Sequence, residues 1–180
     1  MVRNAERTRA RILEAATAEF SARGIAGARV DRIADAAGCN KALLYSYFGN
    51  KEQLFDAVFA ALVERIVSEH PLDARHLEEY AGALVDSYRE PPELVRLALW
   101  DRLERGGAGM RTTELLATDA AKVAAIADAQ ASGDLSSRFR PDESLALVMV
   151  LASILPLLVE GSSAGRMREV VTSAVERLLR

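Results

Sequence analysis

The sequence predicts an all-α protein of about nine helices, with a small N-terminal head and a larger C-terminal bundle. Apolar residues recur at three- and four-residue spacing along most of the 180 residues, as they do on the buried face of a helix. The composition, 50% hydrophobic and 27% charged, suits a soluble chain that buries a sizeable core. We place the boundary between head and bundle after residue 51, which gives domains at 1–51 and 52–180.

The first informative element is a short helix followed by a tight turn. Gly38 lies just past the last apolar residue of the pattern, where a glycine in the left-handed conformation can end a helix. Asn40 can then cap the next helix by accepting backbone N–H bonds. The turn between the two helices is therefore three or four residues long. The apolar face of the first helix consists of Val30, Ile33, Ala34 and Ala37.

The second short helix has an apolar face and a polar, aromatic face. Leu44 and Phe48 share the apolar face. Phenol hydroxyls and ammonium groups donate hydrogen bonds to phosphate oxygens and bases. Two short helices joined by a tight turn, the second with such a surface, predict a helix-turn-helix that places its second helix in the major groove of DNA. The residues that point away from the apolar face are Lys41, Leu43, Tyr45 and Tyr47.

Caps, glycines and prolines divide the middle of the chain. Asn50 with Gln53 has the spacing of a capping box and opens a helix that stops before Pro71. Later elements are expected at 73–89, from the Pro91-Pro92 pair to Arg105, and at 112–132, with a flexible glycine-rich link at 106–109.

The most apolar run of the chain is residues 145–159, with Ser153 as its one polar residue and Pro156 near its end. Spanning a membrane takes about 20 residues, so a helix buried on nearly all sides is the better interpretation. A monomer of this size supplies such burial with difficulty, whereas a second copy of the chain supplies it naturally. We expect the last two helices at 141–160 and 164–179.

Charge is distributed unevenly. Residues 1–51 hold nine Lys or Arg against five Asp or Glu, whereas residues 52–180 hold fourteen against twenty-one, so that a basic head precedes an acidic body. The overall net charge of −3 does not argue against nucleic acid, because screening confines electrostatic attraction to about 8–10 Å. The basic end is the expected DNA end.

The first 55 or so residues resemble the tetracycline-repressor (TetR) family of bacterial transcription regulators. The agreement covers several pieces at fixed offsets, which makes it more specific than a lone short motif. These pieces are Arg11-Ile12-Leu13-Glu14-Ala15-Ala16 followed by Phe20 and Gly24, then Ile33-Ala34 with Ala37-Gly38, then Leu44-Tyr45-Ser46-Tyr47-Phe48 with Lys51-Glu52.

This resemblance implies a set of DNA contacts. Most of them lie in or beside the major groove on the second helix, and Lys51 holds a phosphate from the start of the fourth helix. The implied contacts are Arg29, Asn40, Lys41, Ala42, Leu43, Tyr45, Tyr47 and Lys51.

The chain departs from the family pattern at three places. Ala28-Arg29 stands where a threonine pair is usual, so a helix cap is lost at a cost of about 1 kcal/mol, although Arg29 can still reach phosphate. Cys39-Asn40 replaces Val-Ser. Ala42 replaces glycine, and its methyl group could contact a thymine methyl or hold the helix slightly off the groove.

The resemblance also implies what the bundle does. The last two helices of each subunit would form a four-helix dimer interface, and two recognition helices about one duplex turn apart would read a palindrome. The interface residues would be Leu145, Val148, Ala152, Leu155, Val159, Met167, Val170, Val171, Ala174 and Leu178.

A small, largely apolar molecule bound in the bundle would act through the fourth helix to release the operator, and DNA and ligand would then weaken each other's binding equally. A plain apolar core is the alternative interpretation of the same residues. The candidate pocket consists of Phe59, Val63, Tyr80, Leu84, Tyr88, Trp100, Leu103, Leu116 and Met149.

Other classes of function find little support. His70 and His76 are six residues apart, which does not place two metal ligands on one helix face, and no cofactor or catalytic constellation is indicated. The single cysteine, Cys39, fits a reducing cytoplasm and either fills a small apolar slot or acts as a redox sensor. Charged residues interrupt any signal-peptide pattern at the start, so we expect a cytoplasmic protein with no membrane partner.

Three hypotheses remain. The leading one is a homodimeric, ligand-responsive repressor that binds double-stranded DNA at a palindromic operator. The second is a regulator of the same fold that activates transcription or answers to a partner protein. The third is a helical ligand-binding protein whose head no longer reads DNA.

Overall fold

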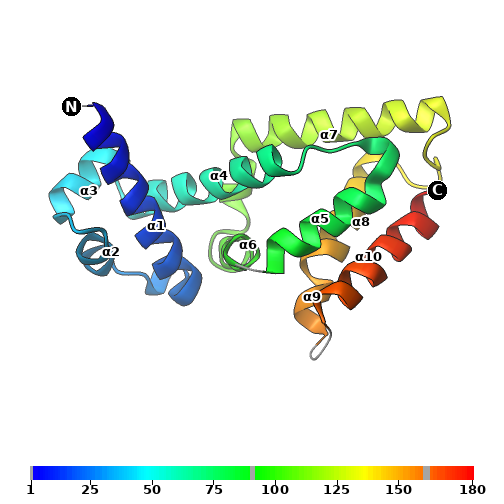
Figure 1. The fold of residues 1–180 in the computed structure, drawn as a ribbon. Coiled ribbons are helices and arrows are strands. Elements are labelled where there is room, and N and C mark those ends of the chain that lie inside the picture. The colour runs from blue at the N-terminus through cyan, green and yellow to red at the C-terminus, as the bar shows by residue number, and fades with distance from the viewer. Residues whose placement is uncertain (1, 90–91, 160–162) are drawn as a thin grey trace. The chain divides into compact units, whose positions relative to one another are not determined.

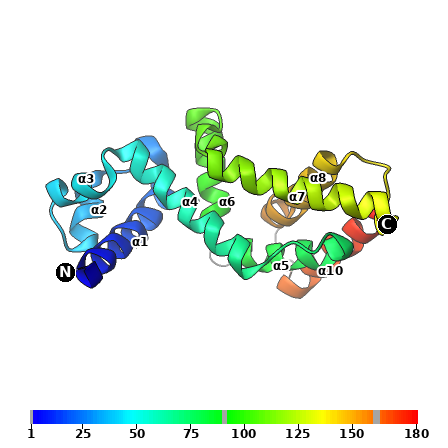
Figure 2. The same cartoon turned by 90° about the horizontal axis from the view of Figure 1, so that it is seen from above.

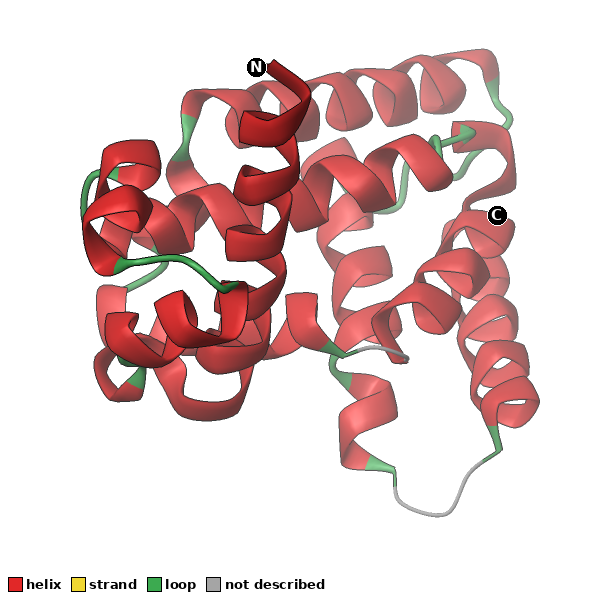
Figure 3. Ribbon diagram, turned by 60° about the vertical axis from the view of Figure 1, so that its left-hand side comes forward, coloured by secondary structure: helices red, strands yellow, loops and turns green. Residues whose placement is uncertain are grey.

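The computed structural model describes residues 2–89, 92–159 and 163–180. Within this described part every regular element is a helix (Figure 3), which confirms the predicted all-α class. The N-terminal elements are α1 (Val2–Gly27), α2 (Val30–Ala37), α3 (Lys41–Phe48) and α4 (Lys51–Glu69).

The C-terminal elements begin with the 3₁₀ turn η1 (Ala74–His76). The helices that follow are α5 (Leu77–Arg89), α6 (Glu93–Arg105), α7 (Thr113–Ser132), α8 (Pro141–Ser153), α9 (Leu155–Leu158) and α10 (Ala164–Leu179), with a second 3₁₀ turn, η2 (Ala108–Arg111), before α7. Pro91, expected to end the helix at 73–89, lies outside the described residues.

The described chain forms two compact units. The first draws on residues 1–64 and 96–112, and the second on residues 65–95 and 113–180. The division falls inside α4 and α6, so each of these helices contributes residues to both units. The functional boundary after residue 51 stays a prediction.

Aromatic packing joins α1 to α4 in the core of the first unit. The Phe20 and Phe55 rings meet edge to face with centroids 5.3 Å apart, and Phe55 stacks on Phe59 at 6.2 Å. The predicted apolar residues of α4, which include Leu54, Val58 and Leu62, are buried. The core also takes in the apolar faces of the short helices, and its fully buried side chains include Ile12, Phe20, Ile33, Leu44 and Phe55.

In the second unit, α5 packs along α10 and α8, and α7 packs on α8 (Figures 1 and 2). One buried cluster holds these helices together, as expected from their apolar spacing. Its fully buried members include Leu77, Leu84, Val85, Ile126, Val148 and Val171.

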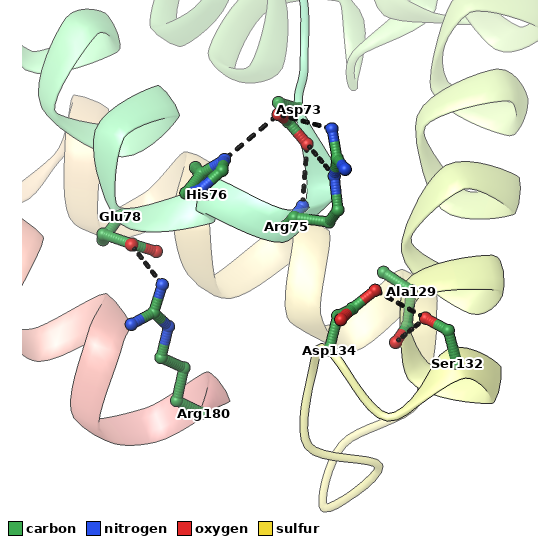
Figure 4. A network of polar contacts seen from close by, with 8 residues as sticks. All are labelled: Asp73, Arg75, His76, Glu78, Ala129, Ser132, Asp134 and Arg180. Atoms are coloured by element: carbon green, nitrogen blue, oxygen red, sulfur yellow. Dashed lines mark hydrogen bonds and ion pairs between the residues drawn. The ribbon is translucent and has the colours of Figure 1, made fainter.

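Polar contacts close one end of the second unit (Figure 4). Asp73 Oδ1 accepts the Arg75 N–H at 3.0 Å, which caps η1 at the start of α5. Arg180 Nη2 donates to Glu78 Oε1 at 2.9 Å and so ties the end of α10 to α5. Ser132 Oγ donates to Asp134 Oδ2 at 2.7 Å, just past α7.

The predicted flexible link at 106–109 is wrong. Gly106 and Gly107 are left-handed, with φ of 64° and 84°, and η2 follows them directly. The Gly109 N–H donates to both carboxylate oxygens of the fully buried Asp101, at 3.1 Å each. A buried carboxylate needs such donors, so it fixes the segment.

The helix expected at 141–160 is interrupted: α8 ends at Ser153 and α9 begins at Leu155. Proline has no N–H, and its ring clashes with the carbonyl four residues earlier. Pro156 therefore cannot donate a hydrogen bond to the Ala152 carbonyl, and the helix is broken here. The start of the last helix is capped by Ser163, whose side chain accepts the Arg166 N–H.

Candidate DNA-binding surface

The turn between α2 and α3 has the predicted geometry. Val30, Ile33, Ala34 and Ala37 are all buried. Gly38 is left-handed, with φ 62° and ψ 42°. Its N–H bonds the Asp35 carbonyl at 3.1 Å, and the Cys39 N–H bonds the Ala34 carbonyl at 3.0 Å. This pair of bonds is the Schellman motif that ends a helix and turns the chain.

Asn40 starts α3 as predicted, because its Oδ1 accepts the Leu43 N–H at 2.8 Å. Leu44 and Phe48 are buried under the helix. The side chains that were expected to meet DNA lie on the other side: Lys41 and Ala42 are exposed, Leu43 and Tyr45 are 39% and 37% exposed, and Tyr47 is half-buried.

The start of α2 lacks a side-chain cap, as the Ala28-Arg29 departure predicts. Glu19 of α1 takes over part of that role. Its Oε1 accepts the Arg29 N–H at 2.9 Å and the Arg32 Nε–H at 2.7 Å. Burial raises the pKa of the Glu19 carboxyl, but the bonds from Arg32 and Arg29 together hold that pKa below its usual value. The sequence pattern did not indicate this residue.

Lys51 holds the connection between α1 and α2. Its Nζ donates to the carbonyl oxygens of Ala26 and Ala28, at 3.3 Å each. An ammonium group has three donors, so one N–H remains for the phosphate that the family resemblance implies. Arg29, another of the implied contacts, is exposed.

Side chains of α6 form hydrogen bonds with the backbone at the carboxyl end of α1, inside the first unit. Arg96 Nε and Trp100 Nε1 donate to the Ser21 carbonyl at 2.9 and 3.4 Å. Glu104 Oε2 accepts the Ala26 N–H at 2.6 Å. Gly24 bends α1 here with φ 72°, and a Cβ on it would lie 3.0 Å from the Trp100 ring. Glycine is therefore required at this corner.

A charge cluster fixes α4 against α6 in the same unit. Arg105 Nη1 pairs with Asp56 Oδ1 at 2.8 Å, and Arg105 Nε lies 3.6 Å from Asp101 Oδ1. The Arg105 guanidinium also covers the Phe55 ring at 5.3 Å. The two helices that contribute to both units are thus tied together beside the head.

The candidate pocket residues divide between the units, with Phe59, Val63, Trp100 and Leu103 in the first. Phe59 is buried, whereas Leu103 is 77% exposed. In the second unit, Tyr80, Leu84 and Tyr88 are buried and Leu116 is 54% exposed. Met149 is half-buried, as are Val63 and Trp100.

Burial makes the two buried tyrosines weaker acids than a tyrosine in water. Burial, with a smaller effect of Asp119, raises the pKa of Tyr80 to about 12. Burial, with smaller effects of Tyr80 and Asp119, also raises the pKa of Tyr88. Both phenols therefore stay neutral at ordinary pH.

Five of the predicted interface side chains pack inside their own chain: Leu145, Val148, Ala152, Met167 and Val171 are buried in the second unit's core. Side chains so enclosed by their own chain leave little surface for a partner, and their place in a dimer interface stays a prediction. The other five are accessible to differing degrees: Leu155, Ala174 and Leu178 are half-buried, whereas Val159 and Val170 are exposed.

Within the described residues, no group of His, Cys, Asp and Glu side chains is arranged to hold a metal ion. The structure does bring His70 and Ser87 together: His70 Nε2 lies 2.6 Å from Ser87 Oγ. This contact connects the end of α4 to α5. Cys39 is half-buried beside the turn. None of the described helices combines the length and hydrophobicity of a membrane-crossing segment.

Comparison with known proteins gives consistent matches over both parts of the chain. Residues 12–58 match the family described as bacterial regulatory proteins, tetR family. Residues 76–177 match the tetracyclin repressor-like C-terminal domain.

Individual relatives agree. The HTH-type transcriptional repressor SCO4008 of Streptomyces coelicolor is 37% identical over 187 residues, covering 98% of this chain and 97% of the relative. The HTH-type transcriptional repressor NicS of Pseudomonas putida is 31% identical, covering 77% and 68%. The solved structure of SCO4942 from Streptomyces coelicolor has a TM-score of 0.84 and 35% identity, covering 96% of this chain and 98% of that one.

Proposed function

The chain belongs to the tetR family of bacterial regulatory proteins, and on that premise we propose a homodimeric repressor that leaves a palindromic operator when a small, largely apolar ligand binds. As a member of this family it is a DNA-binding transcriptional regulator and not an enzyme. The repressor names of SCO4008 and NicS support repression over activation. We place its action in the cytoplasm, where the DNA of a bacterium lies.

The observation that carries the proposal is the exposed side of α3. Lys41, Leu43 and Tyr45 are exposed on one helix whose other side is buried. The Asn40 cap and the Gly38 turn fix the start of that helix. A helix held in this way can present a fixed set of side chains to the base edges of the major groove.

Phosphate contacts complete the proposed binding mode. The proposed donors are the third N–H of Lys51, at the start of α4, and the exposed guanidinium of Arg29, just before α2. Such contacts set the register of the protein on the duplex, while Tyr45, Leu43 and Ala42 would read bases. Binding should therefore weaken steeply with salt.

The exposed apolar residues of α8 to α10 support a dimer. Val150 and Leu158 are 54% and 73% exposed, and Val159 and Val170 are 40% and 38% exposed. Large apolar side chains grouped on neighbouring elements favour contact with a partner. A second copy of this chain is the natural partner, because two heads bind two half-sites of a palindrome.

A route for ligand control is supported by α4 and α6. Each helix has one end in the second unit's core, through Ile66 and Val95, and continues into the first unit. In the first unit, Lys51 of α4 and Glu104 of α6 hold the connection that precedes α2. A ligand bound among the apolar side chains of the bundle would act on the head through these helices.

A ligand titration of the protein–operator complex tests the proposal. Small apolar molecules should include some that dissociate the complex, and by linkage those ligands should bind the free protein more tightly than the complex. If no small molecule does so but a protein partner does, a partner-responsive regulator replaces this proposal. Binding of ligand with no binding of duplex DNA at any salt concentration would contradict the DNA-binding function itself.

A further inference from the structure

An acidic side chain of α2 is paired with the lysine that begins α3. Asp31, the second residue of α2, pairs through Oδ1 with the Lys41 Nζ at 3.0 Å. Both side chains are accessible, with 59% of Asp31 and 48% of Lys41 exposed. The hydrogen bond from Lys41 to Asp31 raises the pKa of the Lys41 ammonium, which therefore stays charged.

The ion pair engages the Lys41 ammonium, which the proposed function assigns to DNA. Lys41 is the first residue of α3 and its ammonium is a donor for a phosphate oxygen. A carboxylate 3.0 Å away takes one of the three N–H donors of that ammonium. It also repels the phosphate, because the separation is far below the screening length of about 8–10 Å. A phosphate must therefore displace Asp31 from Lys41 or share the ammonium with it.

Asp31 also has a reason to stay near this site in the folded protein. It lies in the first turn of α2, and that helix has no side-chain cap. A carboxylate there is favoured by the positive end of the helix. Its backbone position is therefore set by α2.

We propose that Asp31 is an internal competitor that holds Lys41 in the free protein and lowers the affinity of the head for every duplex. The inference rests on the proposed DNA-binding function and names a residue that sets its strength. The result is weaker binding to the operator and to non-specific sites alike, because a phosphate contact carries no sequence information.

The test compares D31N with D35N in the full-length chain. Asp35 lies on the same helix and is exposed, so D35N removes the same charge at a site without Lys41. Dissociation constants for the selected operator and for a random duplex are measured by fluorescence anisotropy over a range of salt concentrations. The same measurements on K41M and on the double variant D31N/K41M complete a double-mutant cycle for the Asp31–Lys41 pair.

We expect D31N to bind both duplexes about two- to five-fold more tightly than D35N, the range that an exposed ion pair allows. The slope of log affinity against log salt should steepen by about 0.9, as for one more phosphate contact. In the K41M background, D31N should raise the affinity for duplex DNA by no more than D35N raises it in the native chain.

Three results would overturn the inference while leaving the DNA-binding function intact. D31N could match D35N, it could bind more weakly than the native chain, or its gain could persist without Lys41. Absence of duplex binding by the native chain would instead remove the proposed function and this inference together. Unfolding curves check each variant, and D31S, which keeps a polar side chain at the helix start, replaces D31N if that variant is unfolded.

Discussion

Replacing Glu19 with alanine should destabilise the DNA-binding head. The Glu19 side chain is only 12% exposed and its Oε1 takes the Arg29 N–H and two donors of Arg32. A hydrogen bond to a charged group contributes about 1.5–3 kcal/mol, and loss of a helix cap costs about 1 kcal/mol. Because the Arg32 side chain is 38% exposed, water recovers part of its loss, and we expect a net cost of about 2 kcal/mol.

The assay is urea unfolding followed by circular dichroism, with thermal melting as a second measurement. A loss of about 2 kcal/mol corresponds to ~4–8 °C in the melting temperature of a chain of this length. Glu19→Gln keeps an oxygen for the Arg29 N–H but loses the charge that attracts Arg32, so it should cost about half as much. Glu14→Ala, an exposed acid earlier on α1, is the matched control.

The pH dependence gives an independent check. The pKa of Glu19 lies below its usual value of 4.5 in the folded chain. Its stabilising effect is therefore present above pH 4.5 and is lost as the pH falls through the lower folded value. The stability difference between the native chain and Glu19→Gln should shrink in acid. The reasoning is refuted if Glu19→Ala is no more destabilising than Glu14→Ala at neutral pH.

Three further predictions concern binding and titration. Lys51→Ala should weaken binding to selected and random duplexes by the same factor and make the salt dependence shallower by about 0.9; a loss confined to the selected duplex would contradict a phosphate role. Tyr45→Ala should change which sequences a random pool enriches, and equal effects on specific and random DNA would remove its base-reading role. Because the pKa of Tyr80 is raised from 10.0 to about 12, unfolding free energy should fall as the pH rises from 10 to 12. Tyr80→Phe should reduce that fall, and an unchanged fall would contradict the assignment.

The sequence predicts the α2–turn–α3 element because its determinants are local. The spacing of Val30, Ile33 and Ala37, the left-handed Gly38 and the Asn40 cap each act within a few residues. Local determinants of this kind can be read from the chain itself, and all of them are confirmed. Whether the exposed residues of α3 contact DNA stays a prediction.

Contacts between distant residues could not be predicted from spacing. Glu104 reaches the Ala26 N–H across 78 positions, and Arg96 reaches the Ser21 carbonyl across 75. Nothing in the local pattern of α6 marks these partners. Lys51 was assigned to phosphate alone for the same reason, because its two carbonyl partners follow from how α4 meets the α1–α2 connection.

Apolar spacing also leaves the partner of a helix face open. Val148 and Val171 belong to the expected interface stripe, yet both are fully buried in their own chain. Val150 and Leu158, which were not singled out for the interface, are exposed on the same segment. Periodicity identifies a buried face, but which of two stripes packs inside and which remains for a partner depends on the arrangement of α5, α8 and α10.

The most direct test of the account is selection of duplexes from a random DNA pool by the purified protein. A salt titration of the enriched sequence against a scrambled control follows. We predict a palindromic sequence bound by two chains, with affinity that falls steeply as salt rises. No enrichment, with weak binding that is insensitive to salt, would contradict the central claim that α3 and the basic head read DNA.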